Sequence, residues 1–272
     1  MAKEKMSEVL LVEPGKSFNI AKWDADFTAQ YKDKEKAVEI LEKNRKRLGE
    51  LQYTLYAENK HSLLIILQGM DASGKDGTIR HVMYGVNPQV CSVTSFKAPT
   101  SEELDHDFLW RIHNAVPPRG EIGIFNRSHY EDVLIVRVHD LVPKTVWSTR
   151  YEQINDFEKM LSKNNVTILK FFLHISKDEQ KERLQERLND PTKNWKMNPE
   201  DLKERELWDD YQKAYEVAIE KCSTKYAPWY IIPANKKWFR NIAVSEIIIE
   251  TLENLKMKFP KPDFDPSTVV VE

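Results

Sequence analysis

A chain of 272 residues, 41% of them apolar, is long enough to bury a core of its own, which excludes a wholly disordered protein. Its 41 basic and 43 acidic residues nearly cancel, so a polyanionic partner would have to be held by a local cluster of charge. The only cysteines, Cys91 and Cys222, lie far apart, which excludes a disulfide framework and a cysteine zinc site.

The N-terminal residues "MAKEKMSEVLLVEPGK" lack the long apolar stretch of a signal peptide. No run of the sequence approaches the roughly 18 apolar residues of a membrane span. We therefore expect a protein of the reducing cytoplasm, with no membrane and no nucleic acid among its partners.

The first long element is predicted over residues 33–59, "DKEKAVEILEKNRKRLGELQYTLYAEN". Apolar residues recur in it at helical spacing with charges between them, at Ala37, Ile40, Leu41, Leu48, Leu51 and Leu55. We expect an amphipathic helix, within an N-terminal helical arm over about 17–60, that packs on the rest of the protein or on a partner.

Five short apolar runs predict buried strands, at 63–68, 90–96, 122–126, 166–175 and 229–234. Strands that alternate with helices favour right-handed crossovers and a parallel sheet with helices on both faces. We therefore predict one α/β domain over residues 1–272, with three layers, α/β/α. Ligands of such a sheet bind at the carboxyl ends of its strands.

Between the last two strands the chain makes a long helical excursion, predicted as a lid over about 177–222. Ser176 and Glu179 predict a capping box at its start, the segment "NDPTKNWKMNPED" interrupts it, and a second helix is expected from Pro199 to Cys222. A final amphipathic helix is predicted over 240–257, followed by a loosely held tail rich in Pro and Asp.

The segment "LLIILQGMDASGKDGTIR" has the G-x-x-x-x-G-K pattern of a phosphate-binding loop between a strand and a helix. In such a loop the backbone N–H groups and the lysine surround phosphate oxygens. The loop residues are Gly69, Ala72, Ser73, Gly74, Lys75 and Asp76. The alternative is a glycine-rich turn without a ligand.

An acid, Asp76, stands where such loops usually carry Ser or Thr. Its carboxylate would repel phosphate, which leaves its purpose open. Asp71, inside the loop, is a candidate ligand for magnesium, and its alternative role is to stabilise the loop through an Asx turn.

The segment "GIFNRSHYED" releases polar residues where a buried strand ends. Asn126 holds the position at which many phosphate-binding-loop proteins place an acid that orders the metal shell. Arg127 is a candidate for stabilising charge on a transferring phosphoryl group, or for a structural ion pair with Glu131 or Asp132.

Basic residues on the predicted lid suggest a phosphate track, namely Arg183, Arg187, Lys193 and Lys196. Glu179, Glu186 and Asp190 lie within a turn of them, so a self-neutralised, solvated helix face explains the spacing equally well. The sequence contains neither the H-E-x-x-H pattern of metallohydrolases nor a G-x-S-x-G elbow.

Three segments together resemble the polyphosphate kinase 2 family: "GMDASGKDGTIRHVMYGVNPQ", the region from "SFKAPTSEELDHDF" to "NRSHYEDVLIVRVH", and the region from "RLNDPTKNWKMNPED" to "APWYIIPANKKWFRN". The resemblance spans roughly residues 20–260 and includes the aspartate after the loop lysine. It implies a fold like that of phosphate-binding-loop (P-loop) kinases. It also implies reversible phosphoryl transfer between inorganic polyphosphate and a nucleotide, with Mg²⁺ or, as an alternative, Mn²⁺.

The same resemblance assigns residues to the site. It implies a catalytic centre of Asp71, Lys75, Asn126, Arg127 and Glu131, with Asp71 and Glu131 at the metal and Arg183 and Arg187 closing from the lid. Nucleotide contacts are expected from Arg80, Asn87, Lys97, Ser128 and Tyr130. The form "NRSHYE" is similar to the branch that accepts both AMP and ADP, with GMP and GDP as further candidates. We also expect a homo-oligomer, either a dimer or a tetramer.

Two other functions stay open at this point. A nucleoside or nucleotide kinase of the same fold would use ATP as donor and ignore polyphosphate. A regulatory module would bind nucleotides or polyanions without turnover, although the loop lysine together with Arg127 favours an enzyme.

Overall fold

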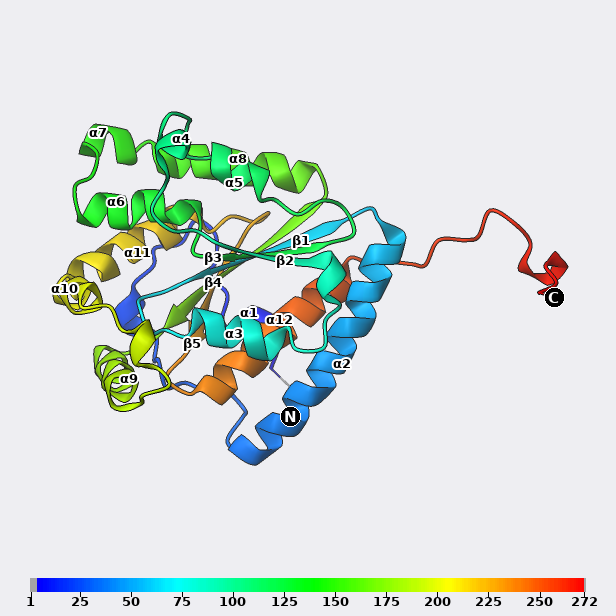
Figure 1. Ribbon diagram of the computed structural model, residues 1–272, viewed down its shortest axis with the longest axis horizontal. Helices are drawn as coiled ribbons and strands as arrows, with labels where there is room; N and C mark the ends of the chain where they lie inside the picture. Colours follow the sequence, from blue (N-terminus) through cyan, green and yellow to red (C-terminus); the bar gives the residue numbers. More distant parts are fainter. Residues whose placement is uncertain (1–3, 272) are drawn as a thin grey trace.

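Five parallel strands form a single sheet at the centre of the computed structural model, which describes residues 4–271 (Figure 1). The strands are β1 (Ser62–Gln68), β2 (Cys91–Ser95), β3 (Ile122–Asn126), β4 (Val166–His174) and β5 (Trp229–Pro233), in the spatial order β2-β3-β1-β4-β5. All five lie within the ranges that the sequence predicts or differ from them by a residue at one end. The predicted parallel α/β sheet is confirmed.

The longer helices are α2 (Lys34–Glu58), α3 (Lys75–Val82), α8 (Arg150–Lys163), α9 (Lys177–Asn189), α10 (Glu200–Glu206), α11 (Trp208–Cys222) and α12 (Lys237–Asn254). The short ones are α1 (Met6–Val9), α4 (Ser101–Leu104), α5 (Trp110–Asn114), α6 (Ile135–Val138) and α7 (Lys144–Trp147). Single 3₁₀ turns lie at Ile20–Lys22 (η1), Pro88–Val90 (η2), His129–Val133 (η3), Asn194–Lys196 (η4) and Pro266–Thr268 (η5).

Helices cover both faces of the sheet, as the alternation of strands and helices predicts. Helices α2, α3 and α12 pack together on one face, and α6, α8 and α11 on the other (Figure 1). Strand β1 is buried at all of its residues because it lies at the middle of the sheet between the two layers. The three-layer α/β/α architecture therefore follows the expectation.

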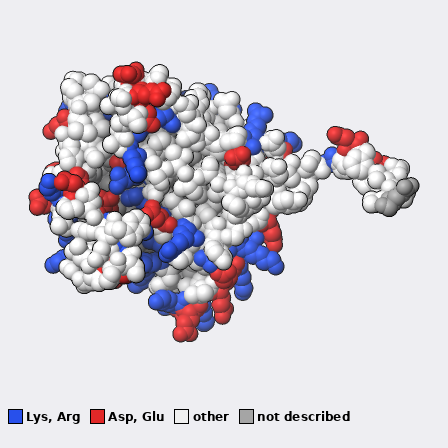
Figure 2. Space-filling view, in the orientation of Figure 1, with Lys and Arg blue, Asp and Glu red and all other residues white. Residues whose placement is uncertain are grey.

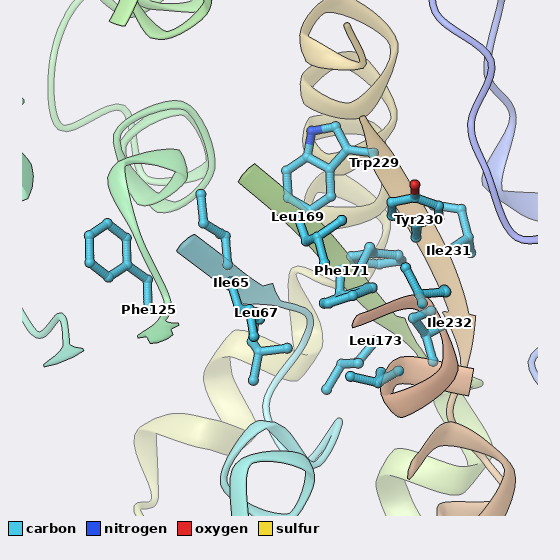
Figure 3. Packing of buried hydrophobic residues seen from close by; sticks show 14 of the residues in the cluster. Ile65, Leu67, Phe125, Leu169, Phe171, Leu173, Trp229, Tyr230, Ile231 and Ile232 are labelled. Carbon is cyan, nitrogen blue, oxygen red and sulfur yellow. The ribbon is translucent and has the colours of Figure 1, made fainter. Parts of the chain in front are cut away.

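The core lies between the sheet and these layers (Figure 3). Ile65 and Leu67 of β1 lie beside Leu169 and Phe171 of β4, all of them 2% exposed or less. Along the outer edge of β5, the N-terminal segment adds main-chain hydrogen bonds from Val12 N to Trp229 O and from Ile231 N to Leu10 O. This cover removes the open edge that β5 would otherwise present to other chains.

The N-terminal arm is helical over a shorter range than expected. Only Lys34–Glu58 forms the long helix, which begins at the Asp33 cap and ends at Asn59 in the left-handed conformation. Residues 17–33 run instead as irregular chain with the turn η1, anchored where Glu216 and Glu220 of α11 accept from Ile20 N and Phe18 N.

The excursion between β4 and β5 differs from the expectation in two details. Ser176 caps α9 by accepting from Glu179 N, but the Glu179 carboxylate pairs with Arg183 Nε at 2.7 Å, so only half of the capping box is present. The expected helix from Pro199 to Cys222 breaks at Leu207 into α10 and α11. Since Ala214, Ala218 and Ile219 are buried against the core, α11 belongs to the helical layer and only the part before Trp208 projects as an excursion.

Beyond α12 the tail extends away from the body of the protein, with exposed Phe264, Val270 and Val271 (Figure 1). No helix among residues 4–271 is both long and apolar enough to cross a membrane.

Candidate active site

The loop from Gly69 to Gly74 joins β1 to α3 at the carboxyl edge of the sheet, where ligands of parallel sheets bind. Gly74 has φ +101°, a conformation that favours glycine, and a Cβ atom at this position would overlap Nη1 of Arg240. The α3 helix begins directly after it at Lys75, so its free N–H groups face the loop. The geometry is that of an anion-binding loop at a helix N-terminus.

Lys75 closes this loop on itself. Its Nζ donates to the carbonyl oxygens of Gly69 at 2.6 Å and Met70 at 3.3 Å. Burial lowers the pKa of Lys75, and attraction to Asp71 opposes that shift. A phosphate oxygen would compete with these carbonyls for the ammonium group.

Arg127 and Asp71 form an ion pair across the site. Arg127 Nη2 donates to Asp71 Oδ1 at 2.9 Å, and the two side chains stay 42% and 26% exposed. Arg127 has φ +64°, which is rare for a residue other than glycine, and its N–H donates to Leu67 O at 3.1 Å. The turn after β3 thus presents the guanidinium group to the loop after β1.

Glu131 belongs to the same charge cluster. Burial raises the pKa of its carboxyl group, while attraction to Arg127 and Lys75 opposes that shift. Asp71 pairs directly with Arg127, and Lys75 and Glu131 lie within electrostatic reach of both. The catalytic centre that these four residues form with Asn126 stays a prediction.

The purpose of Asp76, which the sequence leaves open, becomes visible here. Its Oδ1 accepts a hydrogen bond from Asn126 Nδ2 at 2.6 Å. Asp76 is thus placed beside the loop with its carboxylate turned to an amide, and the pair links the first turn of α3 to the end of β3.

Arg183 does not line an open track, contrary to the expectation for the lid. It is 6% exposed, and its guanidinium group donates to the carbonyl oxygens of Ala72 at 2.9 Å and Ser73 at 3.0 Å, besides those of Ala234 and Asn235. Its donors are used in fixing the loop to α9 and to the residues after β5. Gln180, one turn earlier, adds a bond from Nε2 to Asp71 O at 2.9 Å.

Arg240, in the first part of α12, is a further residue of this site that the sequence does not predict. It is 2% exposed and packs behind Gly74, close to Arg183. Burial, with repulsion from Arg183, lowers the pKa of Arg240 to about 9, so the group stays charged at neutral pH. An isolated arginine far along the chain carries no local signal, which explains the omission.

The other lid cations are more exposed than Arg183 and differ in how closely they are paired. Lys193 Nζ forms an ion pair with Asp190 Oδ2 at 2.5 Å, whereas Arg187 Nη1 lies 3.7 Å from Asp201 Oδ2 and Lys196 lies over the Trp195 ring. Figure 2 shows basic and acidic side chains together around the hollow between α9 and α10 of the lid and α6, which Figure 1 labels in the same orientation. Both interpretations of these residues, a phosphate track and a self-neutralised face, agree with these contacts.

The predicted nucleotide contacts divide into two groups. Arg80 on α3 and Lys97 after β2 are exposed. Asn87 lies past the far end of α3, where its main chain pairs with Gln52 of α2, so it is outside the cluster around Lys75.

Ser128 and Tyr130 are both buried, contrary to the expectation that they touch a nucleotide. Ser128 Oγ accepts from Gln68 Nε2 and from Tyr130 N, each at 3.2 Å, and the Tyr130 hydroxyl donates to Glu158 at 2.9 Å. Their partners lie in β1 and α8, and local spacing does not reveal contacts of this kind.

No group of three or more His, Cys, Asp or Glu residues that could hold a metal occurs within residues 4–271. Magnesium in kinase sites takes only one or two carboxylates, with substrate phosphates and water completing its shell. Asp71, a quarter exposed in the loop, and Glu131, within electrostatic reach of Lys75 and Arg127, would supply such a carboxylate pair. The residues present therefore fit a magnesium site that the substrate completes.

Comparison with known proteins accords with this geometry. Residues 31–260 match the family model described as polyphosphate kinase 2. The chain belongs to the polyphosphate kinase 2 family. This confirms the resemblance seen in the sequence, and the protein is a polyphosphate kinase 2-type phosphotransferase with the fold of P-loop kinases.

Two relatives and one solved structure match along nearly the whole chain. An AMP/ADP-polyphosphate phosphotransferase of Meiothermus ruber is 55% identical over 262 residues, which cover 96% of this chain and 98% of the relative. An ADP-polyphosphate phosphotransferase of Rhodopseudomonas palustris is 47% identical, with 92% and 91% covered. The crystal structure of polyphosphate kinase 2 from Arthrobacter aurescens superposes with a TM-score of 0.94 at 47% identity, covering 97% of this chain and 94% of that one.

Proposed function

We propose that this enzyme transfers phosphoryl groups reversibly between inorganic polyphosphate and adenine nucleotides, with AMP and ADP both serving as acceptors. The observation that carries the proposal is the meeting of Lys75, Arg127 and Asp71 at a helix N-terminus. The 55% identity to an AMP/ADP-polyphosphate phosphotransferase supports the choice of acceptors. GMP and GDP are candidate acceptors as well.

The cations in this cluster suit phosphoryl transfer because that reaction needs positioning and charge neutralisation rather than a covalent nucleophile. Lys75 would exchange its bonds to the Gly69 and Met70 carbonyls for phosphate oxygens. Arg127, whose side chain is partly exposed, would stabilise charge on the transferred group with its guanidinium group. Arg183 and Arg240 would hold the loop in the shape that receives the phosphates.

Asp71 and Glu131 would hold the metal, Mg²⁺ or alternatively Mn²⁺, together with phosphate oxygens. Such an ion supplies positive charge that neutralises bridging phosphates. For Asp71 to serve, its carboxylate must share or release the bond to Arg127, which frees that arginine for the substrate.

One assay tests the function directly. Purified protein with magnesium and polyphosphate is offered AMP, ADP, GMP or GDP separately, and the products are separated by chromatography. Formation of ADP from AMP, and of ATP from ADP, is the expected result. An enzyme that turns over only with ATP as donor would instead be a nucleotide kinase, and binding without turnover would indicate a regulatory module.

We also propose that the protein forms a homo-oligomer, either a dimer or a tetramer. Tyr53 and Tyr56 on α2 are more than half exposed, and aromatic residues of this kind are enriched in protein interfaces. Light scattering coupled to size-exclusion chromatography measures the mass in solution, and a monomer at assay concentrations would remove this part.

A further inference from the structure

A buried hydrogen-bond network lies directly behind the turn that carries Arg127. Its centre is Glu158 of α8, whose side chain is fully buried. Glu158 Oε1 accepts from the Tyr130 hydroxyl at 2.9 Å and from His129 Nε2 at 3.3 Å, and Oε2 accepts from Lys170 Nζ of β4. Lys170 also donates to the Tyr130 hydroxyl at 2.8 Å and to the Cys222 carbonyl at 2.7 Å.

The charges in this network balance. Glu158 and Lys170 are both inaccessible to solvent and pair with each other. Burial lowers the pKa of His129, so this ring is neutral and donates through Nε2. A buried carboxylate that accepts from three donors is held in one geometry, and through it the residues that donate are held as well.

The donors His129 and Tyr130 stand two and three residues after Arg127 in the chain. The turn between them is also tied to β1, by Arg127 N to Leu67 O at 3.1 Å and by Gln68 Nε2 to Ser128 Oγ at 3.2 Å. A left-handed conformation at a residue other than glycine costs of order 1 kcal/mol or more and persists only where its surroundings impose it. The φ of +64° at Arg127 is therefore imposed by anchors on both sides.

We propose that Tyr130 is a positioning residue for the transfer reaction. Its hydroxyl is hydrogen-bonded to Glu158 and Lys170 and thereby fixes the turn after β3. That turn holds the Arg127 guanidinium group against Asp71 and the substrate phosphates. Tyr130 itself touches no substrate, since its side chain is completely buried. The inference rests on the proposed function, because it gives Tyr130 its effect through Arg127.

A positioning role for Tyr130 differs from simple support of the fold because it depends on Arg127. If Tyr130 works only by placing the guanidinium group, its hydroxyl has no further effect on the reaction once that group is gone. Removing a general structural support would lower activity by the same factor whether Arg127 is present or not.

A double-mutant cycle of Tyr130→Phe and Arg127→Ala tests the proposal. Tyr130→Phe keeps the ring and removes only the hydroxyl, and we expect kcat to fall by about 10- to 100-fold, the scale of a small misplacement of a catalytic group. In the Arg127→Ala background the same change should alter kcat by less than about twofold. Equal factors in both backgrounds, or no loss in Tyr130→Phe alone, would overturn the proposal.

The matched control is Tyr226→Phe. The Tyr226 hydroxyl donates to Asn155 O of α8, the helix that carries Glu158, and no hydrogen bond among residues 4–271 joins it to the turn after β3. We expect its kcat to stay within about twofold of wild type. Urea unfolding verifies that each variant is folded. If Tyr130→Phe does not fold, Glu158→Gln is put through the same cycle, because it loosens the same anchor.

The cycle is repeated on the affinity for tripolyphosphate, measured by calorimetry without nucleotide. Coupling between Tyr130 and Arg127 in this affinity, in a protein that turns over no nucleotide, would reject the proposed function and keep the positioning role. Additive effects on both kcat and affinity, in an enzyme active with polyphosphate, would reject the positioning role alone.

Discussion

Asn126 Nδ2 donates to Asp76 Oδ1 at 2.6 Å, so the residue after the loop lysine is paired with the last residue of β3. The pair requires one donor and one acceptor. A carboxylate at both positions would place two negative charges in contact, which raises the pKa of one of them.

The Asn126→Asp variant should therefore lose stability as the pH rises. One carboxyl group would have a folded-state pKa above its unfolded value of about 3.9. The penalty is then absent below that pH and develops as the pH rises through the folded-state pKa. We expect a melting temperature roughly 2–4 °C below wild type at pH 7 and equal to it at about pH 3, measured by calorimetry.

The swapped variant Asp76→Asn/Asn126→Asp is the control for this prediction, since it restores one amide and one carboxylate. It should recover the wild-type pH profile of stability. If the melting temperature of Asn126→Asp followed that of wild type at every pH, the side chains at positions 76 and 126 would not interact in solution.

Lys75→Ala and Asp71→Asn should each lower kcat by about 10²-fold or more, the usual cost of losing one preorganised charge-stabilising group. Both should stay folded, because the side chains lie at the open edge of the sheet rather than in its core. Steady-state kinetics at saturating magnesium measure the loss, with circular dichroism as the check on folding. Near-normal turnover in either variant would remove that residue from the mechanism.

Glu131→Asn should reduce phosphorylation of AMP much more than that of ADP. AMP is one phosphate shorter, so the gap between acceptor and donor is wider, and a carboxylate recruits magnesium to bridge it better than an amide does. The measurement is kcat/KM for each acceptor at saturating polyphosphate. Proportional losses for both acceptors would make Glu131 a structural partner of Arg127 instead.

The pair Arg187→Ala/Lys196→Ala should raise the KM for long-chain polyphosphate and flatten its dependence on salt, with less change in nucleotide affinity. These two cations are more exposed than Arg183 and are only loosely paired. The matched control is Lys203→Ala/Lys213→Ala, two exposed lysines paired within their own helices. Identical salt slopes in wild type and the lid variant would favour the self-neutralised face.

Local patterns predicted the elements and the loop because those features depend on neighbouring residues. The run "LLIILQ" is apolar since β1 is buried on both sides, and the glycine before Lys75 reflects a backbone angle. Periodicity did not show that Arg183 would turn to the carbonyls of the loop or that Tyr130 would face Glu158. Each of those bonds joins segments well separated in the chain, so the residue types alone are compatible with exposed roles as well.

The fit between Gly74 and Arg240 limits how this loop can be transplanted. Residues 69–75 look like a contiguous cassette, but their backbone is fastened by the guanidinium groups of α9 and α12, which lie more than a hundred positions downstream. A chimera that receives the sequence of the loop without both arginines would not hold its backbone in the same conformation. In this protein the shape of the loop depends on the assembled tertiary structure, so a transfer of the loop into another kinase must include the loop and the parts of α9 and α12 that carry the two arginines.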